Sequence, residues 1–114
     1  MKCVTVTTVS LVENLNFYNV YITVANETPI QGVEITVSEY FNPQTNNFVD
    51  VCNIAYLSSI CNTKVITDVN GNASLCLIKG TYIIKLTYDN YVNTVLINVT
   101  KNQDIKLPFF FYNF

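Results

Sequence analysis

The sequence predicts an all-β protein built as a single sandwich of about seven to eight antiparallel strands. Composition is one reason: the 114 residues include 15 Val, 11 Ile, 13 Thr, eight Tyr and seven Phe, all types that favour strands. A second reason is the period-two alternation of apolar and polar residues along several segments, with no long helical period. The third is that turn signals recur at spacings of about ten residues.

Five segments alternate clearly enough to assign an inward face. In each of them the apolar residues fall on one side of an extended chain, which is typical of antiparallel strands packed on one face. The turn signals "NETPIQG", "DVNGN", "KG", "YDN" and "TKNQD" separate or follow these segments. The predicted inward residues are Tyr18, Val20, Ile22 and Val24; Val33, Ile35 and Val37; Ala73, Leu75 and Leu77; Tyr82, Ile84, Leu86 and Tyr88; and Val95, Ile97 and Val99.

Two further segments are less regular. Residues 2–12 predict an extra N-terminal strand, and residues 42–66 mix both parities, which predicts one or two short strands joined by a loop. The whole chain, 1–114, is expected to form one domain. Its core pattern runs over residues 17–108, and residues 109–114 form an aromatic C-terminal tail.

The pieces "ETPIQGVEITV", "TDVNG" and "KGTYIIKLTYDNYV" follow one another between residues 17 and 108. In this order they resemble a carboxypeptidase-regulatory-like domain, which has a transthyretin-like (prealbumin-like), immunoglobulin-type Greek-key sandwich. The resemblance implies an alternating final hairpin over "VLINVTKNQDIKL". The leading strand, the Cys-bearing insertion and the aromatic tail depart from the family's pattern.

The motif residues of this resemblance are expected to be structural. Asn70 and Gly71 would supply the positive φ of a tight hairpin turn. Gly80 would separate two strands, and Tyr82 would close the core with its ring while its hydroxyl reaches the backbone. None of these residues is expected to take part in chemistry.

Charge and composition argue against several function classes. The net charge is −2, all six basic residues are Lys, and the chain has neither Arg nor His. A chain without Arg or a basic cluster is a poor nucleic-acid binder, and one without His lacks the commonest general base. We therefore expect no enzyme activity, no cofactor and no metal site; Asp68 and Asn70 lack the rest of a calcium loop. No apolar run approaches the roughly 18 residues of a membrane span.

Four cysteines stand at positions 3, 52, 61 and 76. Cys52 and Cys61 are close in sequence and flank the predicted loop, which favours a disulfide between them, and Cys3 with Cys76 would be the second pair. The alternative is four buried thiols in a reducing compartment. Oxidation would suit an extracellular or virion-surface location, although no export route is visible in the sequence.

Three sequons, at Asn26, Asn72 and Asn98, would lie at turns or on outward faces. Because the chain holds 16 Asn and 18 Ser plus Thr, chance alone accounts for about this number, so glycans are an option that the sequons do not establish.

The tail "PFFFYNF" raises the question of what its rings contact. Alternation in one strand would bury Phe109 and Phe111, or Phe110 and Tyr112, but not both sets. The tail is therefore either a last core strand or an interface, and contiguous exposed rings normally mark an interface. The predicted interface residues are Phe109, Phe110, Phe111, Tyr112 and Phe114.

Two function classes remain. The first is a structural or assembly module of a virion or cell surface, which associates with itself or another coat protein through strand edges and the tail; the charge-poor composition is similar to that of virion proteins of viruses that infect thermophilic archaea. The alternative is an extracellular module that recognises a glycan or receptor through loops at one end of the sandwich. Its predicted contact residues, which could equally be locally packed, are Tyr40, Phe41, Phe48 and Tyr56.

Overall fold

The computed structural model describes residues 17–111. The chain forms strands throughout, interrupted by two short 3-10 helices in the insertion. The strands are β1 (Phe17–Asn26), β2 (Thr28–Pro29), β3 (Glu34–Asn42), β4 (Asn47–Asp50), β5 (Lys64–Ile66), β6 (Asn72–Ile78), β7 (Gly80–Tyr88), β8 (Tyr91–Val99) and β9 (Gln103–Pro108), and the 3-10 helices are η1 (Val51–Asn53) and η2 (Ala55–Ile60).

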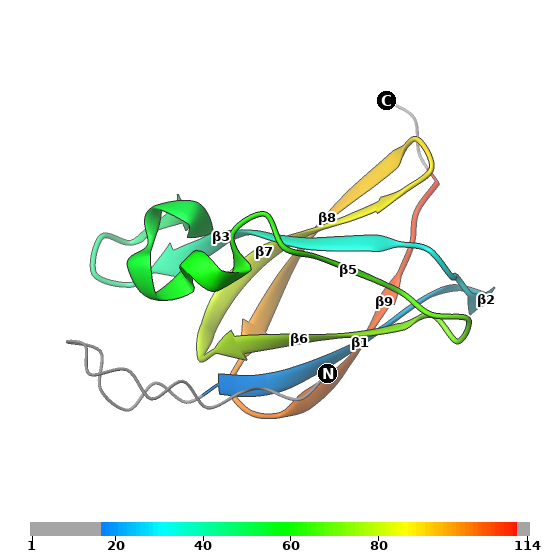
Figure 1. Ribbon diagram of the computed structural model, residues 1–114, viewed down its shortest axis with the longest axis horizontal. Helices are drawn as coiled ribbons and strands as arrows, with labels where there is room; N and C mark the ends of the chain where they lie inside the picture. Colours follow the sequence, from blue (N-terminus) through cyan, green and yellow to red (C-terminus); the bar gives the residue numbers. More distant parts are fainter. Residues whose placement is uncertain (1–16, 112–114) are drawn as a thin grey trace.

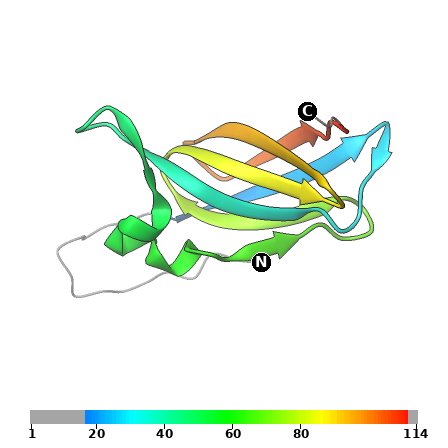
Figure 2. The same ribbon diagram turned by 90° about the horizontal axis from the view of Figure 1, so that it is seen from above.

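Two sheets pack face to face, which confirms the predicted all-β sandwich (Figures 1 and 2). In the first sheet, β1 pairs antiparallel with β2 and β6 and parallel with β9. In the second sheet, the order is β4-β3-β7-β8, and β5 pairs with the part of β3 that β4 leaves free. The parallel β1–β9 pair departs from the expected purely antiparallel arrangement, because β9 returns to the first sheet beside β1.

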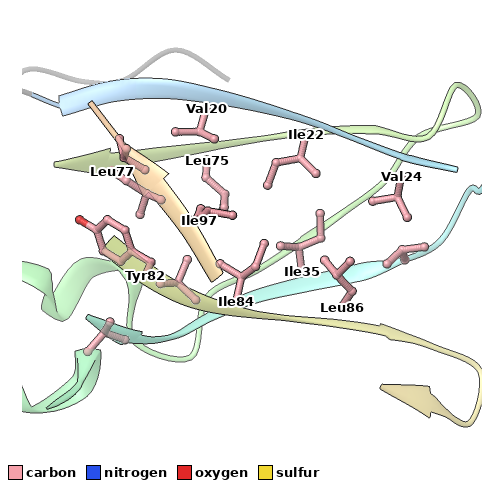
Figure 3. Packing of buried hydrophobic residues seen from close by; sticks show 14 of the residues in the cluster. Val20, Ile22, Val24, Ile35, Leu75, Leu77, Tyr82, Ile84, Leu86 and Ile97 are labelled. Carbon is pink, nitrogen blue, oxygen red and sulfur yellow. The ribbon is translucent and has the colours of Figure 1, made fainter. Parts of the chain in front are cut away.

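The core lies between the sheets and uses the predicted inward faces. Figure 3 shows Val20, Ile22 and Val24 of β1 opposite side chains of β3 and β7, and all three are fully buried. Alternation placed these residues correctly because a strand that covers a core on one face must repeat with period two. The other fully or nearly buried side chains predicted in this way are Val33, Ile35, Val37, Leu75, Leu77, Tyr82, Ile84, Leu86, Ile97 and Val99.

A β-bulge in β3 changes the parity of that strand. Val37 pairs with Ile84 of β7, and the next pair joins Glu39 to Ile83, so one extra residue, Ser38, lies between them. The Ser38 hydroxyl donates to the Ile83 carbonyl oxygen over 3.0 Å. As a result Tyr40 points toward the core side, although simple alternation from Val37 would turn it outward.

Gly80 and Tyr82 have the structural roles that the sequence predicted for them. The chain passes from the first sheet to the second between β6 and β7, and the buried Tyr82 hydroxyl donates to the Ile78 carbonyl oxygen over 2.8 Å across this crossing. A Cβ on Gly80 would lie 2.4 Å from Cε1 of Tyr40, so only glycine lets that ring pack over the crossing. The Tyr82 bond resembles the tyrosine corner of other sandwiches.

The insertion is more structured than the sequence indicated. Of the one or two short strands predicted in residues 42–66, two are present, β4 and β5, but η1 and η2 join them where a plain loop was expected. The predicted disulfide between Cys52 and Cys61 is confirmed, with Cα atoms 4.8 Å apart. Buried Val51 and Leu57 anchor the two helices to the core. Period-two reasoning missed these helices because their few residues carry no strand pattern.

Two predicted hairpins are wrong. Between residues 67 and 72 only Gly71 has a positive φ, of 75°, and the turn connects β5 of one sheet to β6 of the other. The Gly71 amide donates to the Asp68 carbonyl oxygen over 2.9 Å, which closes the turn. Similarly, β8 and β9 lie in different sheets and do not form the final hairpin that the resemblance implied.

Candidate interaction surfaces

Aromatic side chains gather at the end of the sandwich where the described chain finishes. We call the five residues of this cluster the aromatic end: Tyr88, Tyr91, Phe109, Phe110 and Phe111. Tyr88 and Tyr91 flank the turn between β7 and β8. The Phe111 ring lies edge-on to the rings of Tyr91, Phe109 and Tyr88, with centroids 5.2, 5.1 and 6.2 Å away. This geometry is favourable for ring pairs and fixes Phe111 on the surface.

The first ring of the tail belongs to the core. Phe109 is 1% exposed and packs edge-on against Tyr88, with centroids 6.0 Å apart. Its amide donates to the Ala25 carbonyl oxygen over 3.2 Å, which continues the contact between β9 and β1. Phe109 is therefore removed from the predicted interface, because its ring has no surface left to offer a partner.

The backbone of the tail is held in place by β8. The Asn93 side chain accepts from the Phe110 amide over 2.7 Å and donates to the Phe110 carbonyl oxygen over 2.9 Å. This pair of bonds imitates strand pairing and ties the tail, which arrives from the first sheet, to the second sheet. Phe110 and Phe111 stay 48% and 42% exposed on this fixed backbone. Both remain predicted interface residues.

An open groove adjoins the aromatic end. Its volume is about 490 Å³, and Phe111 and Tyr88 form its aromatic side. Its other lining residues come from the end of β1, from β2 and from the following loop; they are Asn26, Thr28, Pro29, Ile30 and Gln31. Buried Thr67 fixes this loop, because its hydroxyl accepts from the Val33 amide over 2.9 Å and donates to the Ile30 carbonyl oxygen over 2.7 Å.

The insertion lies at the opposite end of the long axis (Figure 1). Tyr40, half-buried, packs against Tyr82 with ring centroids 5.3 Å apart. Burial raises the pKa of the Tyr40 hydroxyl, and the neighbouring Tyr56 hydroxyl and its hydrogen bond raise it further. The pKa of Tyr82 is raised much more strongly, first by burial and then by Tyr40 and Tyr56. The hydroxyls of Tyr40 and Tyr82 therefore stay protonated, and the Tyr56 hydroxyl lies beside them.

The predicted contact residues of the insertion thus separate into two sets. Tyr40 and Tyr56 join the tyrosine cluster with Tyr82, and only Tyr56 is exposed, at 37%. Phe41 and Phe48 face each other across β3 and β4, with ring centroids 5.2 Å apart. Each set is packed largely against itself, and the four residues do not form one continuous surface.

Sequence reasoning missed three residues of the aromatic end and its support. Tyr88 was predicted only as an inward-facing strand residue, and Tyr91 and Asn93 received no role. The available signal was the turn itself, since its two flanking tyrosines must lie close together. The position of the tail beside them depends on β9 pairing with β1, which no local pattern indicates.

The remaining predicted sites keep their status as predictions. The sequon residues Asn26, Asn72 and Asn98 are all exposed. Cys76 also has no free thiol, but its predicted partner Cys3 lies outside the described residues. The interface residues Tyr112 and Phe114, together with the extra strand over residues 2–12, lie outside them too.

Within residues 17–111 there is no group of three or more Cys, Asp or Glu side chains that could hold a metal ion. Over the same residues, no helix is long and apolar enough to cross a membrane.

Comparisons with known proteins bear on the fold. No family model matches the chain, and no curated protein matches it in sequence. Among solved structures, that of the Bacillus anthracis TIE protein is similar over 82% of this chain, with a TM-score of 0.51 and 20% identity. The match covers 16% of the TIE protein, so this chain spans a small part of its length. The likeness supports a β-sandwich, and the specific prealbumin-like class stays a prediction.

Proposed function

We propose that this domain is a non-enzymatic structural module that binds another protein through its aromatic end, as part of a virion or cell-surface assembly. The observation that supports this most is the exposure of Phe110 and Phe111 on a backbone fixed by Asn93. Rings held in one position lose little conformational entropy on binding, which makes them suitable interface anchors.

The surroundings of these rings fit a protein partner. Asn26, Thr28 and Gln31 line the groove together with Tyr88 and Phe111, so hydrogen-bonding groups accompany the exposed rings. This is the usual anatomy of an interface, with an aromatic centre and a polar rim. The disulfide between Cys52 and Cys61 is the kind of bond that persists outside the cytosol, which favours the surface location.

The alternative, recognition of a glycan or receptor by the insertion end, has less support. Its aromatic residues pack mainly on one another, and Tyr56 alone among Tyr40, Phe41, Phe48 and Tyr56 is exposed beyond a third. The exposed rings gather at the tail instead, and a tail cluster favours assembly.

Deletion of residues 111–114 tests this proposal. Phe111 is partly exposed, so its loss should remove about 1 kcal/mol of ring contacts and lower Tm by about 4–8 °C. We expect the truncated chain to fold and to form smaller species than the full chain at equal concentration, measured by sedimentation and thermal melting. A matched control is Tyr21→Ser, which removes a ring of similar exposure, 44%, from β1. A truncated chain that melts far lower while keeping its full assembled mass would contradict the proposal.

A further inference from the structure

The outer edge of β8 lacks the charged residues and the proline that protect many edge strands. Its nine residues, Tyr91–Val99, include no charged residue and no proline. Among the described residues it pairs with β7 alone. Natural proteins protect such edges with charges, proline or short length, because unpaired backbone groups and apolar side chains invite another strand.

Most other edges differ from β8 in this respect. β9 carries Asp104, Lys106 and Pro108, and β4 and β5 are four and three residues long, with Asp50 and Lys64. β6 also lacks charged residues and proline, but with seven residues it is shorter than the nine-residue β8. An edge as long as β8 without protection is therefore expected to have a partner.

The even-numbered residues of β8 direct their backbone groups to this open edge. Ile83 of β7 lies opposite Leu96 of β8. The Ile83 carbonyl oxygen accepts from Ser38 of β3, so the backbone groups of Ile83 point toward β3 and away from β8. Two opposed residues of an antiparallel pair either both point their amide and carbonyl groups toward each other or both point them away. Leu96 must therefore direct its amide and carbonyl away from β7. The Asn98 carbonyl agrees, since it accepts from Gln103 of β9 over 2.9 Å.

The side chains at these positions are self-complementary. Val92 and Leu96 are 58% and 56% exposed, and Thr94 between them is exposed too. If two β8 strands pair antiparallel about a two-fold axis at Thr94, each Val92 lies opposite a Leu96 and Thr94 lies opposite its own copy. Apolar side chains then meet apolar ones, the threonines can bond to each other, and no charges oppose.

We propose that β8 pairs with β8 of a second copy of this chain. This pairing would join the β4-β3-β7-β8 sheets of the two copies into one continuous sheet. This inference deepens the proposed assembly function by naming one partner, and it uses the backbone edge of the strand whose Asn93 side chain holds the tail. A two-fold contact of this kind closes on itself, so it produces a dimer rather than a fibre. Since an edge alone buries less than the roughly 800 Å² per partner of a standard interface, we expect a dissociation constant on the order of 10–100 µM.

Leu96→Lys tests the edge, with Ile66→Lys as its control. Both substitutions put a charge on the outer face of the same sheet at sites of equal exposure, 56% and 59%, but Ile66 lies on β5. In sedimentation over 1–500 µM, we expect the chain lacking residues 111–114 to reach a dimer, Leu96→Lys in that background to stay monomeric, and Ile66→Lys to dimerise unchanged. A chain that stays monomeric throughout, or two lysine variants that lose the dimer equally, would overturn the proposal. Loss of the dimer by Leu96→Lys with no effect of tail deletion would leave the edge pairing intact and reject the tail.

Cysteine variants test the register. Under mild oxidation, Thr94→Cys should cross-link two copies through residue 94, because the axis places this position against itself. Val92→Cys alone should not cross-link, and Val92→Cys combined with Leu96→Cys should. Peptide mapping identifies the bonds. A Val92→Cys chain that cross-links as well as Thr94→Cys would exclude the proposed two-fold axis.

Discussion

The two ends of this sandwich both carry aromatic clusters, but they treat their rings differently. At the insertion end, Tyr40 is accommodated over Gly80, and the hydroxyls of Tyr56 and Tyr82 lie close to it. At the aromatic end, a network of side-chain bonds from Asn93 fixes the backbone, while Phe110 remains 48% exposed. One end uses polar contacts to pack its rings, and the other uses them to present its rings.

The difference separates folding from binding within the tail itself. Phe109 completes the core from the same short segment that exposes Phe110 and Phe111. The fold thus holds the tail in position through Phe109 and leaves the rings of Phe110 and Phe111 on the surface. The largest expected difference in stability is therefore between substitutions of Phe109 and Phe111, two residues apart in the same tail.

Phe109→Ala should destabilise the domain by about 3–5 kcal/mol, as the loss of a buried Phe does, whereas Phe111→Ala should remove only about 1 kcal/mol of ring contacts. Denaturant unfolding of both variants measures the difference, and equal m-values would show that the folded state stays compact. Equal losses of stability in the two variants would mean that Phe111 belongs to the core as Phe109 does, and that its ring is not held on the surface for a partner.

How far the sequence predicts these ends depends on the range of the interactions that build them. The period-two pattern gave the inward faces of β1, β3, β6, β7 and β8 correctly, because that pattern is a property of a single strand. It could state that Phe109 and Phe110 lie on opposite faces. It could not select the buried one, since that choice depends on the parallel pairing of β9 with β1, 83 positions apart in the register Val20 to Gln103.

The insertion shows a second limit. The Cys52–Cys61 disulfide was predicted from spacing alone, because few residues separate the two sulfurs. The bulge at Ser38 was not predicted, although it decides that Tyr40 joins the core side of β3. A bulge changes the parity by one residue, and a mixed-parity segment allows several positions for it.

Removal of the disulfide by Cys52→Ser with Cys61→Ser sharpens the comparison at the insertion end. With a sequence separation of nine, the chain-entropy model gives a loss of about 2–3 kcal/mol. The helices η1 and η2 should become easier to open, while the aromatic end, at the far end of the long axis, should not change. Hydrogen exchange resolves the two regions, and association at matched concentration should equal that of the unmodified chain. A loss of association in this variant would assign the interface to the insertion.

The smallest expected effect concerns Tyr82 at the insertion end. Tyr82→Phe removes the hydroxyl that bonds to Ile78 and should cost about 1–2 kcal/mol at neutral pH. Because burial raises the pKa of Tyr82 above its ordinary value of 10.0, the folded chain keeps this hydroxyl protonated where unfolded chains ionise. The stability that the bond contributes is therefore present below pH 10 and decreases as the pH rises above it.

Denaturant unfolding between pH 8 and 11.5 measures this effect. The chain with Tyr82 should exceed Tyr82→Phe in stability at pH 8, and the two should converge above pH 10. Phe111→Ala is the control from the aromatic end, where the lost contacts carry no titratable proton from residue 111, so its difference from the unmodified chain should stay constant with pH. A constant difference for Tyr82→Phe as well would show that ionisation of the Tyr82 hydroxyl does not contribute to unfolding, and the two ends would then differ in packing alone.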